Sequence, residues 1–200
     1  MNDAAKEFPD WDFFYKENEI EKMPWYEKNL DPDLELEIKS RDINKGRFLD
    51  LGTGPGTQAT QLAELGFVVT GTDISENAIQ KANKISTNVN FVRDDFLMSK
   101  LPDGSFDYIL DRGCFHVFEP AQRRKYVEQI KRILDRKGIL FLKCFSVEEP
   151  GDTGPHRFSK QDIKDIFNED FVIESVKNTV YHGTLVPLPK ALFVVMKKPS

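Results

Sequence analysis

An acid and three glycines lie within one short stretch of the chain, Asp50-Leu51-Gly52-Thr53-Gly54-Pro55-Gly56. An apolar run from Arg47 to Leu51 leads into it, and a helical pattern begins at Thr57. Glycines leave no side chain between the backbone and a ligand, and the N–H groups in the first turn of a helix are free to face that ligand. The stretch therefore predicts a glycine-rich turn that binds a nucleotide-like ligand.

Further acids follow three other apolar segments that have the composition of strands. They are Asp73, the pair Asp94 and Asp95, and Asp111. Open α/β sheets bind ligands at the carboxyl ends of their parallel strands, so these acids and the glycine turn are expected at one edge of a sheet. Carboxylates at this edge can accept hydrogen bonds from ammonium and hydroxyl groups of a ligand.

The elements that must position these residues alternate between strand and helix. Strands are expected at 47–51, 67–73, 89–93, 106–110 and 139–145, followed by closing strands at 171–180 and 191–197. Helices are expected after the glycine turn and after the N-caps Asp31, Ser75, Glu119 and Ser159, with the Glu119 helix closing at Gly138. The pattern predicts one α/β domain over residues 1–200, with a mostly parallel sheet, helices on both faces and closing strands that pair antiparallel.

Charge and composition limit the classes of function. The chain has 200 residues, a net charge of -5 and two cysteines. An acidic chain has no general attraction to phosphate backbones, so a nucleic-acid partner is disfavoured. No apolar run approaches the roughly 20 residues that span a bilayer, and the N-terminus lacks a secretory signal, so a cytoplasmic protein without a membrane segment is expected. The cysteines and histidines lack metal-ligand spacing, so no metal site is expected.

Aromatic residues are concentrated ahead of the first strand, between Phe8 and Tyr26. They fit an amphipathic helix that packs on the domain. They also fit a lid that covers the ligand and excludes water. Residues 1–45 are therefore expected to form an N-terminal helical lid or cap.

Two ligands fit a glycine turn of this kind. A dinucleotide site has the pattern G-x-G-x-x-G/A, but Thr57 occupies its last position and an additional Gly56 stands one residue earlier. The pattern of a strand followed by acid-x-G-x-G-x-G, here Asp50, Gly52, Gly54 and Gly56, is similar to that of class I S-adenosylmethionine-dependent methyltransferases. The resemblance extends over residues 47–198 and implies a Rossmann-like fold whose seven strands have the order 3-2-1-4-5-7-6, the last strand antiparallel.

The resemblance implies S-adenosylmethionine as the cofactor and assigns residues to its parts. Asp50 would face the ammonium group and Asp73 the ribose hydroxyls, although Asp73 would serve a dinucleotide equally well. Asp95 would receive the adenine amino group, with the Phe96 N–H at the ring, and Asp94 is the alternative acid. The predicted cofactor-binding residues are Trp11, Tyr15, Asp50, Gly52, Thr53, Gly54, Gly56, Asp73, Ile74, Asp94, Asp95, Phe96, Asp111 and Arg112.

Shorter motifs resemble the thiopurine S-methyltransferase group and the related thiol and halide methyltransferases. They are the segment Asp111-Arg112-Gly113, the Gly154-Pro155 loop before a helix, and Trp11 followed by Pro24-Trp25. This resemblance implies methyl transfer to a small molecule with a soft nucleophile, such as a thiol or a thiopurine. The predicted catalytic residues are Asp111, Arg112 and His116, and the predicted substrate residues are Trp25, Tyr26, Phe115, His116, His156 and Arg157.

A soft nucleophile needs little help from a strong base, because a free thiol ionises at about pH 8.5. Arg112 is expected to contact cofactor or substrate, with Asp111 beside it, and His116 is a candidate proton acceptor. Cys114 is expected to be a packing residue and Cys144 a core residue. A monomer or weak homodimer is expected.

Two other functions stay open on the sequence alone. A protein lysine or carboxylate methyltransferase would leave little sequence trace of the surface that docks its substrate. A non-catalytic S-adenosylmethionine-binding regulatory protein could keep the same acids and glycines, because these support binding and not turnover. A nucleic-acid methyltransferase is disfavoured, because D-R-G-C stands where amino-methylating enzymes often carry [D/N]-P-P-[Y/F].

Overall fold

Eight strands form one sheet at the centre of the structure, a computed structural model that describes residues 6–199. The strands are β1 (Arg47–Leu51), β2 (Val68–Asp73), β3 (Asn90–Arg93), β4 (Phe106–Arg112), β5 (Leu134–Ser146), β6 (Arg157–Phe158), β7 (Val172–Val180) and β8 (Lys190–Lys197). They have the order β3-β2-β1-β4-β5-β8-β7, and β6 pairs with β5 outside this path. Residues 1–5 of the expected N-terminal lid, and Ser200, lie outside the described residues.

The predicted strand order is confirmed, with β7 and β8 as the sixth and seventh strands of the prediction. The sheet differs from the prediction by one short strand, because Arg157 and Phe158 pair with Phe145 and Ser146 where a loop was expected. β8 is antiparallel to both β5 and β7, as predicted for strands joined without a helix. β7 consequently runs in the direction of β5, and the residues that follow it lie at the carboxyl edge of the sheet.

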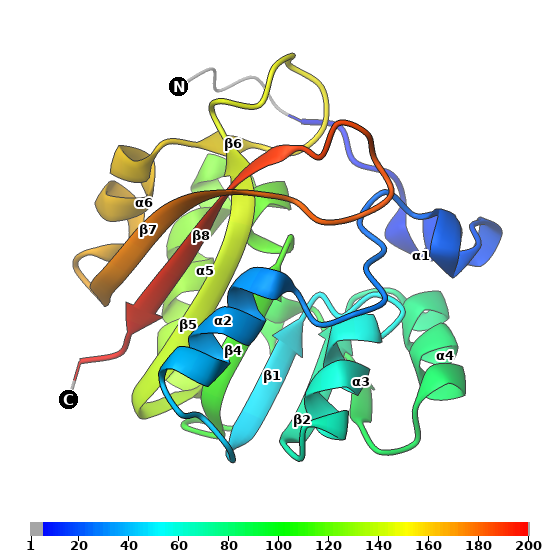
Figure 1. Cartoon of the computed structure of the whole chain (residues 1–200), viewed down its shortest axis with the longest axis horizontal. Helices are drawn as coiled ribbons and strands as arrows, with labels where there is room; N and C mark the ends of the chain where they lie inside the picture. The colour runs from blue at the N-terminus through cyan, green and yellow to red at the C-terminus, as the bar shows by residue number, and fades with distance from the viewer. Residues whose placement is uncertain (1–5, 200) are drawn as a thin grey trace.

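Helices cover both faces of the sheet (Figure 1). They are α1 (Trp11–Glu17), α2 (Pro32–Ser40), α3 (Thr57–Glu64), α4 (Glu76–Ile85), α5 (Pro120–Ile133) and α6 (Lys160–Phe167), with 3-10 turns η1 (Ile20–Lys22), η2 (Phe96–Met98) and η3 (Phe115–Val117). The carboxylate of Asp31 accepts the Asp33 N–H at 3.1 Å, and the Ser75 hydroxyl accepts the Ala78 N–H at 3.0 Å. These caps, and a capping box at Ser159, begin α2, α4 and α6 where the sequence predicts.

The apolar side chains of the sheet alternate between two cores. Leu49 and Ile109 belong to the core that contains α5 and α6, and Phe48 and Leu110 belong to the core that contains α2 and α3. Figure 1 shows α2 on the viewer's side of the sheet and α5 behind it. Burial on both faces explains why these strands read as continuous apolar runs in the sequence.

Two predicted boundaries are wrong. The helix expected to close at Gly138 ends at Ile133, and β5 begins directly at Leu134. The pairing of β4 with β5 shifts register near this start, and Lys137 there has a φ of 62°, so the strand contains a bulge. The charged residues of this bulge interrupt the apolar pattern, and the sequence therefore does not indicate the early part of the strand. In the N-terminal segment, the extended backbone at Asn18 ends α1, and the single expected helix becomes a short helix and a 3-10 turn.

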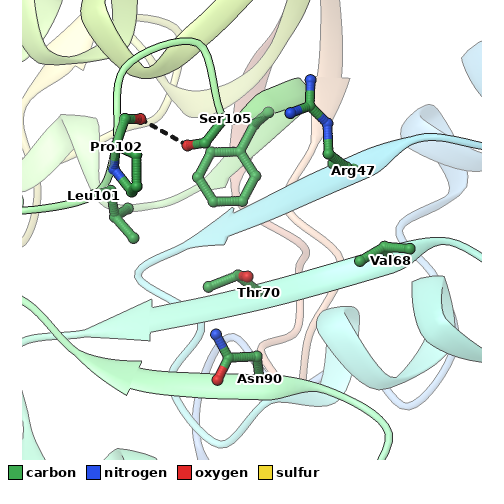
Figure 2. A pocket seen from close by; sticks show the side chains of 8 residues that line it. Arg47, Val68, Thr70, Asn90, Leu101, Pro102 and Ser105 are labelled. Atoms are coloured by element: carbon green, nitrogen blue, oxygen red, sulfur yellow. Dashed lines mark hydrogen bonds between the residues drawn. The ribbon is translucent and has the colours of Figure 1, made fainter.

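A shallow groove of about 250 Å³ lies at the amino edge of the sheet, opposite the glycine turn. Figure 2 shows Thr70 and Asn90 on neighbouring strands and Leu101 on the loop before β4, all lining this groove. The connection from β3 to β4 contains the 3-10 turn η2 and no longer helix, so part of the sheet face stays uncovered. The groove contains none of the predicted site residues and is separate from the candidate site.

Candidate active site

The glycine turn lies between the carboxyl ends of two strands. β1 is flanked by β2 and β4, and Leu51 pairs with Thr72 on one side and with Asp111 on the other. The end of β3 follows next to β2, where Asp73 pairs with Arg93. The structure therefore brings the predicted acids to one edge of the sheet, around the turn after β1.

The backbone of the turn requires glycine. Gly52, Gly54 and Gly56 have φ values of 66°, 52° and 82°, which residues with side chains rarely adopt. The Gly54 N–H donates to Oδ2 of Asp73 at 2.9 Å, and the Thr53 hydroxyl donates to Oδ2 of Asp50 at 2.6 Å. The turn is thus held between the acid that precedes it and the acid that ends β2.

The glycines also allow close approach of neighbouring groups. A Cβ atom at Gly54 would lie 2.7 Å from the Tyr15 hydroxyl, and one at Gly52 would lie 3.0 Å from Cβ of Cys114. A Cβ atom at Gly56 would lie 2.6 Å from an aromatic ring of β3, so Gly56 is needed for packing within the domain. Gly52 and Gly54 therefore form the floor of the site, between α1 and the turn after β4.

Two buried carboxyl groups flank this floor. Burial raises the pKa of Asp50 to about 7, against the hydrogen bond from Thr53. Burial also raises the pKa of Asp73 to about 6, against hydrogen bonds from backbone N–H groups. Because burial destabilises their charged forms, both groups would gain from a ligand that supplies ammonium or hydroxyl donors.

An exposed apolar side chain, and an acid with one unpartnered oxygen within residues 6–199, adjoin Asp73. Ile74 is 49 % exposed, although it is hydrophobic. Oδ2 of Asp94 is buried and has no hydrogen-bond partner within residues 6–199. Asp95 is exposed and accepts a backbone N–H of η2, while the Phe96 side chain packs in the core. Of the two candidate acids, Asp94 and Asp95, Asp94 is therefore the one with a buried carboxylate oxygen that has no partner within residues 6–199.

Asp111 fixes the turn that follows β4. Its buried carboxylate accepts the N–H groups of residues 113–115 and the Tyr126 hydroxyl, the last at 2.7 Å. Burial raises the pKa of Asp111 to about 6, and these donors oppose the rise. Its oxygens are engaged within the protein, which favours a positioning role over direct contact with a ligand.

Arg112 joins three segments that are distant in the sequence. Its Nε donates to Oδ2 of Asp31 at 2.8 Å and its Nη1 to the Trp25 carbonyl at 2.9 Å, while its Nη2 donates to the His182 carbonyl. The Arg112 side chain is only 6 % exposed. Arg112 thereby connects the end of β4 with the segment before α2 and with the β7–β8 loop.

Asp31 lies at the centre of a buried ion cluster formed by Asp31, Asp33, Arg112 and Lys143. Nζ of Lys143, whose side chain is fully buried, lies 2.7 Å from a carboxylate oxygen of Asp31 and 2.7 Å from one of Asp33. Burial alone would raise the pKa of Asp31, but the charges of Lys143 and Arg112 bring it below its ordinary value. Each buried cation therefore has a carboxylate partner.

His116 and Tyr181 meet at Gly113, directly after β4. Their ring centroids are 5.9 Å apart, and both rings contact Phe145. A Cβ atom at Gly113 would lie 3.2 Å from Nε2 of His116 and would overlap the Tyr181 hydroxyl. The Phe145 N–H donates to Nδ1 of His116 at 3.4 Å, so the neutral imidazole carries its proton on Nε2. Burial lowers the pKa of His116 to about 3, which makes it a weak base and disfavours its predicted role as proton acceptor.

Three predicted substrate residues do not join this group. Phe115 lies in the hydrophobic core with no exposed surface, so the prediction that its ring lines the substrate site is corrected. Nε2 of His156 lies 3.5 Å from a Glu119 carboxylate oxygen, and the His156 side chain is buried. Arg157 donates to two carbonyls of its own loop.

Trp11, Phe14, Tyr15, Trp25 and Tyr26 form an N-terminal aromatic cluster. The Phe14 and Trp25 ring centroids are 5.3 Å apart, and Tyr15 is buried against the glycine turn. Asp12 attaches α1 to the start of α4. Its Oδ1 accepts hydrogen bonds from the Ser75 hydroxyl and from the Asn77 N–H, both at 2.9 Å. The predicted cofactor residues Trp11 and Tyr15 therefore lie in an element that covers the turn.

Residues 6–199 contain no group of three or more His, Cys, Asp or Glu side chains arranged to hold a metal ion. In the same range, no helix has both the length and the apolar character that crossing a bilayer requires. Cys114 and Cys144 are free thiols, and burial raises the pKa of both. Neither has the lowered pKa of a reactive thiolate.

Comparison with known proteins identifies the family. Residues 48–138 match the family described as a methyltransferase domain. An uncharacterized methyltransferase of Schizosaccharomyces pombe is 40 % identical over 102 residues, which cover 49 % of this chain and 70 % of that protein. The chain belongs to the class I S-adenosylmethionine-dependent methyltransferases.

Other relatives of this methyltransferase differ in the acceptor that their names give. Probable thiol methyltransferase 2 of Arabidopsis thaliana is 27 % identical over 149 residues, 72 % of this chain and 66 % of that protein. EEF1A lysine methyltransferase 2 of Homo sapiens is 27 % identical over 135 residues, 62 % of this chain and 52 % of that protein. A solved structure described as the conversion of a disulfide bond into a thioacetal group during echinomycin biosynthesis has a TM-score of 0.82 at 22 % identity, covering 94 % of this chain and 92 % of that chain. This likeness supports the fold alone.

The side chains of the methyltransferase fit S-adenosylmethionine. That molecule carries an ammonium group, ribose hydroxyls and an adenine amino group, all of which donate hydrogen bonds. Asp50 and Asp73 are buried acids beside the turn, and Asp94 has a buried oxygen without a partner within residues 6–199. At Gly52 and Gly54 the absence of a side chain lets Cys114 and the Tyr15 hydroxyl lie directly against the turn.

The sequence interpretation missed Tyr181 and Lys143 of the methyltransferase. Tyr181 follows a strand that runs parallel to β5, so the strand directions alone would place it at the carboxyl edge. Lys143 is a charged residue inside an otherwise apolar run, which signals a buried partner. Asp31, which provides that partner, was assigned only as a helix cap.

Proposed function

We propose that this methyltransferase transfers a methyl group to a small-molecule acceptor with a soft nucleophilic atom, such as a thiol or a thiopurine. The observation that carries the proposal is the cover over the end of β4, where Arg112 binds the backbone of two separate segments. The same segments also bind each other, because the Thr184 N–H donates to the Pro24 carbonyl at 3.1 Å. Figure 1 shows the β7–β8 loop, in orange and red, reaching toward the blue N-terminal segment. A site covered in this way suits a small acceptor, and the thiol methyltransferase relative supports a soft nucleophile.

The chemistry requires positioning more than acid–base catalysis. When bound, S-adenosylmethionine supplies the methyl group, whose carbon bonds to the acceptor sulfur as its bond to the sulfonium sulfur breaks and leaves the electron pair there. A thiolate acceptor has no proton to lose in this step, so alignment in a site without water can lower much of the barrier. This agrees with the weak basicity of His116.

The proposal gives roles to seven of the predicted cofactor residues. Asp50 faces the ammonium group, Asp73 accepts the ribose hydroxyls, and Ile74 packs against the adenine ring. Asp94 accepts the adenine amino group, supported by its unpartnered inward oxygen within residues 6–199. Residues 6–45 act as the lid, with Tyr15 next to the cofactor. Asp111 and Arg112 are positioning residues, the first for the turn after β4 and the second for the cover.

Protein lysine methylation is the second candidate. The human lysine methyltransferase relative supports it, with an identity equal to that of the thiol methyltransferase. A lysine side chain inserted from a protein would need an opening between the N-terminal segment and the β7–β8 loop. The hydrogen bonds that join these two segments make this candidate the weaker of the two.

We further propose that the protein acts in the reducing cytosol as a monomer or weak homodimer, without a nucleic-acid partner. Two free cysteines suit a reducing compartment. The net charge of -5 opposes binding to phosphate backbones.

A product assay tests the proposed function. The protein is incubated with methyl-labelled S-adenosylmethionine and, in separate reactions, with an aromatic thiol, a thiopurine or a lysine-containing peptide. The proposal expects labelled thioether and stoichiometric S-adenosylhomocysteine from the thiol or the thiopurine. Labelled peptide alone would replace it with lysine methylation, and tight cofactor binding without any product would favour a regulatory protein.

A further inference from the structure

Two polar atoms at the end of β4 form no hydrogen bond within residues 6–199, although neither atom is fully enclosed by the protein. They are the Tyr181 hydroxyl and Nε2 of His116, in side chains of residues that are 5 % and 6 % exposed. Both atoms approach the same side of Gly113, where a Cβ atom would overlap the hydroxyl. Because both atoms keep some accessible surface and lack a partner in the described chain, a polar group from outside the chain can complete their hydrogen bonds.

Both atoms are hydrogen-bond donors. The Phe145 N–H occupies Nδ1 of His116, which leaves the proton on Nε2. Burial raises the pKa of the Tyr181 hydroxyl, so it keeps its proton at neutral pH. The rings beside these donors, including Phe145 with a centroid 5.4 Å from that of Tyr181, give them an apolar surrounding.

Charges of both signs lie near the pair, and those of the protein are already paired. The Arg112 guanidinium lies 4.9 Å from the Tyr181 ring centroid, and Nζ of Lys143 lies 5.9 Å from it. Of the acids near Tyr181, Asp31 is paired with Arg112 and Lys143, and Asp111 has its oxygens engaged by backbone N–H groups and by Tyr126. Both side chains that converge on Gly113 present hydrogen-bond donors and neither carries a carboxylate, so the pair suits a hydrogen-bond acceptor such as an anion.

The pair adjoins the cofactor floor. Gly113 precedes Cys114, whose Cβ would lie 3.0 Å from a Cβ atom at Gly52. Successive Cα atoms are about 3.8 Å apart, so the two donors lie close to the turn that binds the methionine part of the cofactor. An acceptor held by these donors would be next to the transferable methyl group.

We propose that Tyr181 and His116 form an acceptor pocket that holds a soft anion, a thiolate in the reaction, through two hydrogen bonds beside the cofactor turn. This inference rests on the proposed function and deepens it by naming the residues that select the acceptor and the charge that they select. The bound thiolate would form a bond to the methyl carbon as the bond from that carbon to the sulfonium sulfur breaks and leaves its electron pair on that sulfur, so no proton has to leave the pocket. A lysine acceptor must lose a proton before it reacts, and neither donor can receive one.

Thiocyanate is the probe for the pocket, since it is a small soft anion. Its affinity for the protein saturated with S-adenosylhomocysteine is measured by titration calorimetry. Tyr181→Phe keeps the ring contacts and removes one donor, so thiocyanate affinity is expected to fall about tenfold, as for loss of a hydrogen bond to a charged group. His116→Leu is expected to act similarly, while His116→Gln, which retains an N–H donor, restores binding to within about threefold. Tyr108→Phe, which removes a hydroxyl from another part of the sheet, is the matched control.

The outcomes separate the pocket from the proposed function. Equal thiocyanate affinity in the wild type and Tyr181→Phe overturns the pocket, even if the wild type methylates thiols. Tyr181-dependent thiocyanate binding in a protein that methylates only lysine peptides supports the pocket and overturns the proposed function. S-adenosylhomocysteine affinity should stay within about twofold in every variant, and a parallel loss of both affinities would overturn the pocket in favour of a general structural role.

Discussion

At the level of single residues, burial controls the protonation of the site. It raises the pKa of Asp50 to about 7 and that of Asp73 to about 6, whereas it lowers the pKa of His116 to about 3. The acids gain from a ligand that donates hydrogen bonds, and the histidine stays neutral across the physiological range. The residue roles can therefore be separated by substitution and by pH.

Asp73→Asn should lower the affinity for S-adenosylhomocysteine about tenfold or more, measured by calorimetry. The substitution removes the negative charge that would receive the ribose hydroxyls, and a hydrogen bond to a charged group contributes about 1.5–3 kcal/mol. Asp94→Asn should also weaken binding, because its inward oxygen is unpartnered within residues 6–199. Asp95→Asn is the control and should have little effect, since Asp95 is exposed. An unchanged affinity of Asp73→Asn for S-adenosylhomocysteine would contradict the assignment of Asp73 to the ribose hydroxyls.

Because His116 is buried and neutral, its contribution to the free energy of unfolding should depend on pH. Its pKa is lowered from 6.5 to about 3 in the folded protein, so below pH 6.5 the unfolded chain binds a proton that the folded chain excludes. Relative to His116→Gln, the wild type should lose about 1.4 kcal/mol of unfolding free energy per pH unit below 6.5, or on the order of 2 kcal/mol at pH 5. Urea unfolding at pH 7.5 and at pH 5 measures the difference. Parallel pH profiles of the two proteins would contradict a buried neutral histidine.

At the level of elements, a cover over the carboxyl edge distinguishes this chain from a bare nucleotide-binding sheet. The cover consists of α1, the segment before α2 and the β7–β8 loop. Arg112 and Lys143, from adjacent central strands, attach the segment before α2 to the sheet through Asp31. The ion cluster thus links sheet and cover, and α1 is attached separately through Asp12.

Asp31→Ala should destabilise the protein by about 3–5 kcal/mol in urea unfolding, because it leaves two buried cations without a central partner. The side chains of Asp31, Lys143 and Arg112 are 1 %, 0 % and 6 % exposed, so water cannot compensate for the loss. Asp103→Ala breaks an ion pair with Arg132 in which the Asp103 side chain is 78 % exposed, and it should cost less than about 1 kcal/mol. Equal effects of the two substitutions would show that the cluster does not anchor the cover.

Asp12→Ala should loosen α1 without unfolding the domain. The carboxylate of Asp12 accepts hydrogen bonds from Ser75 and Asn77 at the start of α4. Hydrogen exchange in Trp11–Glu17 should slow when S-adenosylhomocysteine binds the wild type, and this protection should decrease in Asp12→Ala. Glu17→Ala, at an exposed position of the same helix, is the control. If hydrogen exchange in α1 of the wild type does not change when S-adenosylhomocysteine binds, α1 is a packed helix and not a lid.

Local patterns made most elements predictable from the sequence. The glycine turn, the caps at Asp31, Ser75 and Ser159 and the continuous apolar strands depend on neighbouring residues, which the sequence displays directly. The early start of β5 was not predictable, because its first residues bulge out of the ladder. Tyr181 and the choice between Asp94 and Asp95 depend on which distant groups surround them, and no local pattern records this.

At the level of the whole molecule, the cofactor should stabilise the fold, and it should do so selectively. S-adenosylhomocysteine at about 100 times its Kd adds about 2.7 kcal/mol, which corresponds to a Tm increase of roughly 5–10 °C for a chain of this size. NAD at the same concentration should leave Tm unchanged, because Thr57 departs from the dinucleotide pattern. Thermal denaturation with each ligand checks both statements. An equal Tm increase with NAD would reopen the dinucleotide interpretation of the glycine turn.

The fold and the acids define the methyl donor, whereas the cover and the Tyr181–His116 pocket define the acceptor. A crystal structure of the protein with S-adenosylhomocysteine and thiocyanate tests this division most directly. We predict that the sulfur of S-adenosylhomocysteine faces the turn after β4, with thiocyanate in hydrogen-bond contact with Tyr181 and His116 beneath a closed cover. A cofactor sulfur that faces an open groove, with no anion at Tyr181, would contradict the account and favour a protein acceptor.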